Sequence, residues 1–187
     1  MSNKPYKDFE PKWVKEPAPP DSYRSIFRWG DPEFVKYPKE SLYKMMKEKF
    51  VMTDEDFDHY SGDIGMDKVK LDAPCNLARE HIEAFEGIVG KDNVTAEDYP
   101  RLAVAYGKTG YDAARLRERR IDSLPDLVIY PSSTEEVEDI VAYCAEKKIP
   151  LYVYGGGSSV TMGVEPVKGG VSLDMRKRFN KVLDFNE

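Results

Sequence analysis

The sequence predicts an α+β fold, with an extended and helical N-terminal region over residues 1–123 and a β-α-β unit within residues 124–187. Two observations lead to this prediction. Prolines are too dense before residue 40 for long helices, and after Leu124-Pro125-Asp126 short apolar runs flank a segment with helical periodicity. A strand, a helix and a second strand in this order run with both strands parallel in one sheet.

The first forty residues combine many prolines with aromatic side chains, among them Trp13 and Trp29. Because aromatic side chains are unfavourable in water, we expect an extended arm that packs on a larger body. Short helices are expected over residues 42–50, after Ser41 as a cap, and from Thr53 onward. The acidic residues after Thr53 lack the glycine and final glutamate of an EF-hand loop, so they indicate a helix start.

A longer helix is expected to begin at Asp72, with Pro74 near its first position, and to end at Gly90. Thr95-Ala-Glu-Asp98 has the spacing of a capping box, which predicts another helix directly after it. The N-terminal region is therefore expected to consist mostly of helices and loops.

In the C-terminal unit, strands are expected over residues 127–130 and 151–154, with a helix between them. Ser133 and Glu136 have capping-box spacing at the start of this helix, and Cys144 falls on its apolar face. A buried, reduced thiol is therefore expected at Cys144.

The formal net charge of −6 gives no general attraction for nucleic acid or for an anionic membrane surface. The local exception is a group of arginines in the segment 111–120, whose secondary structure the sequence leaves open. We interpret them as a solvated face paired with nearby acidic residues: Arg115, Arg117, Arg119 and Arg120 with Glu118, Asp122 and Asp126. Binding of a phosphate or carboxylate is the competing interpretation.

Targeting and metal signals are absent from the sequence. Cys75 and Cys144 form neither a disulfide framework nor a metal site. The N-terminus has no apolar core of a signal peptide and no apolar run approaches transmembrane length, so a cytoplasmic protein without a transmembrane segment is expected. His59 and His81 have no partner motif and are interpreted as surface or structural residues, which leaves the catalytic residues unknown.

The loop Gly155-Gly-Gly-Ser-Ser159 follows the strand 151–154, and two further strands are expected at 171–174 and 181–185. Glycines let a ligand approach the backbone closely, and successive free N–H groups form a concave nest suited to phosphate oxygens. A Rossmann motif would follow the first strand and open a helix, and a Walker loop would need Gly-Lys-Ser/Thr, so neither applies. A plain turn between two strands is the competing interpretation.

Residues 124–187 resemble the opening of the FAD-binding domain of the vanillyl-alcohol oxidase / p-cresol methylhydroxylase (PCMH) family. The motifs that carry the resemblance are Pro125-Asp-Leu-Val-Ile-Tyr-Pro, Ser133-Thr-Glu-Glu-Val, Pro150-Leu-Tyr-Val-Tyr-Gly-Gly-Gly-Ser-Ser-Val and Gly170-Val-Ser-Leu-Asp-Met. The resemblance implies that the first half of a PCMH-type domain is present and that its glycine loop cradles the pyrophosphate of FAD. The contacts so implied are Val153, Tyr154, Gly155, Gly156, Gly157, Ser158 and Ser159. Gly157 stands where some members carry a flavin-tethering histidine, so non-covalent FAD is expected.

Within the family, the alkyldihydroxyacetonephosphate synthase group and its bacterial relatives match most closely, through the spacing of Gly107, Leu116-Arg-Glu118 and Leu124-Pro-Asp126. Tyr106, Lys108 and Tyr111 stand where that group tends to carry histidines, and flavin-dependent 2-hydroxy acid dehydrogenases are the nearest competitor. The resemblance implies the FAD-binding portion of a flavin-dependent oxidoreductase acting on a small-molecule substrate. The alternative is a non-catalytic fragment or subunit that completes its fold with the missing C-terminal half or a partner chain.

Overall fold

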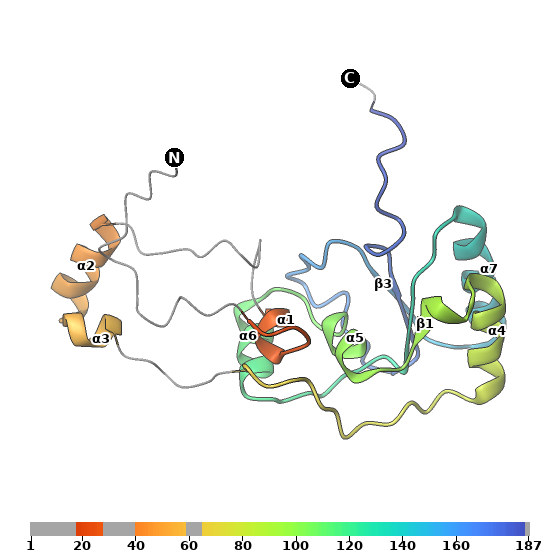
Figure 1. Ribbon diagram of the computed structural model, residues 1–187, viewed down its shortest axis with the longest axis horizontal. Coiled ribbons are helices and arrows are strands. Elements are labelled where there is room, and N and C mark those ends of the chain that lie inside the picture. The colour runs from red at the N-terminus through yellow and green to blue at the C-terminus, as the bar shows by residue number, and fades with distance from the viewer. Residues whose placement is uncertain (1–17, 28–39, 59–64, 186–187) are drawn as a thin grey trace.

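The computed structural model describes residues 18–27, 40–58 and 65–185. Its centre is a four-stranded mixed sheet with the strand order β1-β2-β4-β3 (Figure 1). The strands are β1 (Val94–Thr95), β2 (Leu127–Ile129), β3 (Leu151–Tyr154) and β4 (Val171–Asp174). β4 is parallel to both β2 and β3, and β1 is antiparallel to β2. Helices together with this sheet confirm the α+β prediction.

The predicted β-α-β unit is formed by β2, α7 (Thr134–Lys147) and β3. Its two strands are parallel, as expected, but they are not neighbours, because β4 lies between them. Val171 of β4 is in register with Leu127 on one side and with Leu151 on the other. The sheet thus leaves β3 at one edge, directly before the glycine loop.

The strand expected at 181–185 is a wrong prediction. These residues have no regular secondary structure, and Leu183 is 94% exposed. An apolar run becomes a strand only where a neighbouring strand accepts its backbone hydrogen bonds, and no strand in the described part of the chain pairs with it.

One face of the sheet is covered by α4 (Arg79–Val89) and α7, which lie side by side in Figure 1. The buried core between these layers consists of Phe85, Val89, Leu127, Ile129, Ile140, Cys144, Val171 and Leu173. Cys144 is buried as predicted, and burial raises the pKa of its thiol to about 11. α7 begins after Ser133, whose hydroxyl accepts from the N–H of Glu136, so the predicted cap is confirmed.

The opposite face packs against α5 (Asp98–Ala103) and the residues after it. Val104, Val128 and Tyr154 form a small buried cluster there. Next to this cluster, α1 (Tyr23–Phe27) and α6 (Gly110–Arg117) pack together around a second core, seen beside α5 in Figure 1. Its buried members are Tyr23, Ile26, Val69, Leu102, Ala105, Tyr106 and Leu116.

Two helices begin later than the sequence suggests, because tertiary hydrogen bonds hold the preceding backbone. α4 starts at Arg79, not near Asp72. The carbonyl of Ala73 accepts from the Arg101 guanidinium, and the N–H of Asn76 donates to Asp126. Similarly, α5 starts at Asp98 with Glu97 as its N-terminal cap, because the expected capping residue Thr95 lies in β1 and pairs with Val128 of β2.

The remaining helices are α2 (Glu40–Phe50), α3 (Asp54–Asp58) and the short 3-10 helix η3 (Lys91–Asn93). α2 and α3 confirm that two short helices form there, but Ser41 is not the cap of the first one, because α2 already begins at Glu40. The Tyr43 and Phe57 rings of these helices lie 4.5 Å apart. Most of the proposed arm, with Trp13 and Trp29, lies outside the described residues, as does His59. Every helix in the described part of the chain is too short or too polar to cross a membrane.

Candidate functional site

The glycine loop begins where β3 ends, at the carboxyl edge of the three parallel strands. Tyr154, the last residue of β3, is in register with Asp174, the last residue of β4. Both strand ends therefore present side chains at the same edge, next to the loop. In open sheets with parallel strands, this edge is where ligands bind.

The backbone of the loop is open to its surroundings. Gly155 and Gly156 are exposed, and a Cβ added to either one would meet no atom within 4 Å. In the described part of the chain, no hydrogen bond uses the backbone N–H groups of residues 155–159 as donors. A loop of unused N–H donors with free space around Gly155 and Gly156 is suited to an anionic ligand.

Gly157 anchors this loop on the sheet. Its φ of +69° is in the left-handed region, and a Cβ at this position would overlap the hydroxyl of Tyr154. The Tyr154 side chain is buried, and burial raises the pKa of its phenol, which keeps it protonated near neutral pH. The two predicted contacts Tyr154 and Gly157 thus form the floor of the loop.

The other predicted contacts lie around that floor. Val153 is 59% exposed at the sheet edge, Ser158 is exposed and Ser159 is half-buried. The seven predicted residues are consecutive in the sequence, and the structure places them at the end of β3 and in the loop that follows it. Their contact with FAD stays a prediction.

A cation that the sequence reasoning missed lies beside the loop. Arg176 binds both carboxylate oxygens of Asp174, with distances of 2.9 Å from Nε and 2.6 Å from Nη2. Its guanidinium lies 4.5 Å from the centre of the Tyr154 ring, and the bond to Asp174 raises the pKa of Arg176. The signal was the basic run Arg176-Lys177-Arg178, which is separated from the end of a strand by a single residue.

The N-terminal region also reaches the loop, through Gly107 and Lys108. The Lys108 N–H donates to the Ser159 carbonyl over 2.9 Å, and its Nζ donates to the Ile26 carbonyl of α1. Burial, and secondarily the charge of Arg176, lowers the pKa of the Lys108 ammonium. These contacts join residues far apart in the sequence, 82 positions for Lys108 and Ile26, which explains why periodicity could not reveal them.

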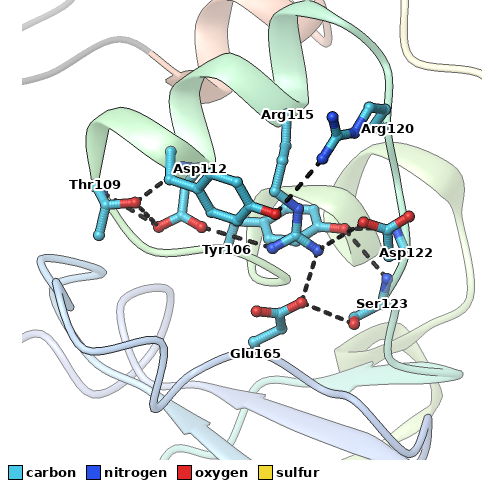
Figure 2. A network of polar contacts seen from close by, with 9 residues as sticks. Tyr106, Thr109, Asp112, Arg115, Arg120, Asp122, Ser123 and Glu165 are labelled. Atoms are coloured by element: carbon cyan, nitrogen blue, oxygen red, sulfur yellow. Dashed lines mark hydrogen bonds and ion pairs between the residues drawn. The ribbon is translucent and has the colours of Figure 1, made fainter.

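A polar network is centred on the buried Arg115, which contacts Glu165 in the segment that follows the loop (Figure 2). Arg115 Nη2 lies 2.7 Å from Glu165 and 3.2 Å from Asp122. Ser123 donates to Glu165 as well, over 2.9 Å. The bond to Arg115 lowers the pKa of Glu165, and the same bond raises the pKa of Arg115.

This network corrects the interpretation of the arginines as a solvated face. Arg115 is 3% exposed, whereas Arg120, with its partner Glu118, is exposed as expected. Arg119 pairs with Asp67. Asp126 pairs with none of them, since its carboxylate accepts from the N–H groups of Asn76 and Gly170. The difference arises because α6 turns one side of the arginine segment toward the loop that carries Glu165.

Other candidate groups have structural surroundings. His81 Nδ1 lies 2.9 Å from the Tyr143 hydroxyl between α4 and α7, as expected of a structural histidine. Among the described residues, no group of three or more His, Cys, Asp or Glu side chains is placed to hold a metal ion.

The chain is similar to several known proteins. A family model described as an FAD binding domain matches residues 125–187. An alkyldihydroxyacetonephosphate synthase of Dictyostelium discoideum is 28% identical over 159 residues, covering 81% of this chain and 26% of the relative. A glycolate oxidase subunit of Bacillus subtilis is 29% identical over 111 residues, covering 59% of this chain and 22% of the relative.

A solved structure of alkyldihydroxyacetonephosphate synthase is similar in fold, with a TM-score of 0.58 and 30% identity. The likeness covers 63% of this chain and 22% of that one. The chain spans about a quarter of the length of the curated relatives it matches.

Proposed function

The chain belongs, through residues 125–187, to the FAD-binding family of the PCMH type, and on this premise we propose that its Gly-Gly-Gly-Ser-Ser loop holds the pyrophosphate of FAD. FAD is the cofactor of this family. The observation that carries the proposal is the set of unused N–H donors at residues 155–159, placed at the carboxyl edge of three parallel strands.

The charges around the loop support an anionic ligand. Lys108 contacts the loop at Ser159 and Arg176 lies over the ring of Tyr154, and Arg176 is close enough for its charge to lower the pKa of Lys108. Both are held in place, Arg176 by Asp174 and Lys108 by the carbonyl of Ile26. An oriented cation next to open N–H groups favours an anionic ligand, because the cation does not have to be ordered when the ligand binds.

We further propose that the chain is the FAD-binding portion of a flavin-dependent oxidoreductase. When bound, the flavin supplies redox chemistry toward a small-molecule substrate, and the residues of this chain supply binding and orientation. An ether-lipid synthase-like reaction and a 2-hydroxy acid dehydrogenase-like reaction are both compatible with the relatives. We assign no general acid or base to this chain.

The test is a titration of the purified 187-residue chain with FAD, followed by flavin fluorescence and visible absorbance. Gly156→Val is the decisive variant, because a Cβ there meets no protein atom and leaves the unliganded fold undisturbed. Charge-assisted hydrogen bonds contribute roughly 1.5–3 kcal/mol each, so loss of one or two lowers FAD affinity at least about tenfold.

Gly87→Val is the matched control, since Gly87 is an exposed residue of α4 with no atom within 4 Å of a Cβ. Its FAD affinity is expected to equal that of the unaltered chain. Equal affinity of Gly156→Val and Gly87→Val would refute the assignment of the loop. An unaltered chain that takes up no FAD would instead favour a non-catalytic unit that completes its site with a further segment or partner chain.

A further inference from the structure

The glycine loop and the segment that follows it are held from outside at two points. The first is Ser159, whose carbonyl accepts from the Lys108 N–H over 2.9 Å. The second is Glu165, whose carboxylate accepts from Arg115 over 2.7 Å. The two residues that hold the segment, Lys108 and Arg115, are seven positions apart in the N-terminal region. Lys108 lies just before α6 and Arg115 lies within it.

The first contact requires a glycine. Gly107 lies so close to Ser159 that a Cβ would overlap the Ser159 carbonyl oxygen and lie 3.1 Å from its carbon. These are backbone atoms, which cannot rotate aside as the end of a side chain can. The backbones of residues 107 and 159 are therefore in direct contact, and only glycine permits this approach.

The second contact is fixed by its surroundings. The Arg115 guanidinium lies 4.4 Å from the centre of the Tyr106 ring, and the Tyr106 hydroxyl accepts from the N–H groups of Asp122 and Ser123. Burial raises the pKa of Tyr106, so this hydroxyl keeps its proton. In Figure 2 the Arg115 guanidinium lies against this ring and a dashed line joins it to Glu165.

The backbone between Lys108 and Arg115 is fixed by a capping box at the start of α6. The Thr109 hydroxyl accepts from the Asp112 N–H over 2.9 Å, and the Asp112 carboxylate accepts from the Thr109 N–H over 3.2 Å, which is a complete capping box. The distance between Lys108 and Arg115 is therefore set by the first turns of α6. Two anchor points at a fixed distance restrict the loop more than two independent contacts would.

We propose that Gly107, Lys108 and Arg115 act together as a bracket that positions the glycine loop before FAD arrives. This inference rests on the proposed function of the loop and adds positioning residues outside the matched domain. A loop that is ordered in advance loses less conformational entropy on binding, so the bracket increases the affinity for FAD without touching it.

The experiment reads the order of the loop without any ligand. A nitroxide spin label is attached at Val160→Cys, an exposed position between the two anchors, in a chain that carries Cys75→Ser. The buried Cys144, with its raised pKa, does not compete for the label. A second labelled chain with Ala142→Cys, on the exposed side of α7, reports whether the sheet and its helices remain folded.

Gly107→Ala displaces the first anchor and Glu165→Gln weakens the second. Both are expected to increase the mobility of the label at position 160 and to leave the label at position 142 unchanged. Gly110→Ala is the matched control, because a Cβ at Gly110 meets no atom within 4 Å. In a parallel FAD titration without labels, affinity should fall about tenfold for the first two variants and stay constant for the control.

Identical label mobility at position 160 in all chains would overturn the bracket. Increased mobility with unchanged FAD affinity would also overturn it, since the loop would then not need positioning for its ligand. If the unaltered chain binds no FAD, the proposed function fails for this chain, whereas the label at position 160 still decides whether the bracket orders the loop.

Discussion

The glycine loop and the Arg115 network lie next to each other, yet they differ in hydrogen bonding. The carboxylate and hydroxyl groups of the network have partners and Arg115 Nε is the exception, whereas the loop N–H groups are left without partners. In the network, the carboxylate of Glu165 accepts from both Arg115 and Ser123. Tyr106 accepts from two backbone N–H groups. In the loop, the N–H groups of residues 155–159 donate to nothing within the described part of the chain.

This difference in hydrogen bonding distinguishes a structural network from a candidate binding loop. Buried polar groups must be hydrogen-bonded, because an unpaired one loses its solvation without compensation. Exposed N–H groups of a loop can stay in water until a ligand replaces that water. The Arg115 network therefore contributes to stability and placement, whereas the donors of the loop stay available for the ligand proposed above.

The largest expected effect tests the scaffold. Arg115→Met leaves Glu165 buried without its cationic partner, so the free energy of unfolding should fall by about 3–5 kcal/mol in chemical denaturation. Arg120→Met serves as the control, because its pair with Glu118 is exposed and contributes at most about 1 kcal/mol. Equal losses in the two variants would contradict a structural role specific to the buried pair.

A smaller effect on stability is expected to distinguish two glycines of the loop, Gly157 and Gly156. Gly157→Ala forces a side chain into the left-handed region and against Tyr154, so unfolding free energy should fall by roughly 1–2 kcal/mol or more. Gly156→Ala should change stability by less than about 0.5 kcal/mol, because its Cβ points into open space. Thermal denaturation of both variants measures the contrast, and a reversed order would refute the division into floor and open backbone.

The smallest effect is the pH dependence of the buried pair. Arg115 lowers the pKa of Glu165 in the folded chain, so this carboxylate contributes stability above its unfolded pKa, about 4.3, and that contribution is lost as pH falls through the folded value. The difference in unfolding free energy between the unaltered chain and Glu165→Gln should be largest above about pH 5 and shrink in acid. A difference that is constant across this range, measured by urea denaturation, would contradict the shift.

The C-terminal half was predicted more accurately than the N-terminal half. Strands β2, β3 and β4 and the start of α7 at Ser133 follow local signals: apolar runs, helical periodicity and a capping serine. α6 was left open because its capping residues, Thr109 and Asp112, precede a segment dominated by arginines instead of an apolar stripe. The division of the chain at residues 123 and 124 stays a proposal, and β1, which precedes it, pairs with β2, which follows it.

The sequence by itself determined the composition of the loop, its position after a strand of a β-α-β unit and the resemblance to an FAD-binding family, because these depend on residues that are near one another in the chain. Only the tertiary structure decided that β4 lies between β2 and β3, and that residues 181–185 have no strand to pair with. It also placed Gly107 against Ser159 and Arg115 against Glu165. Those contacts join positions about fifty residues apart, and their formation depends on close packing and on the burial of charge, which no local pattern encodes.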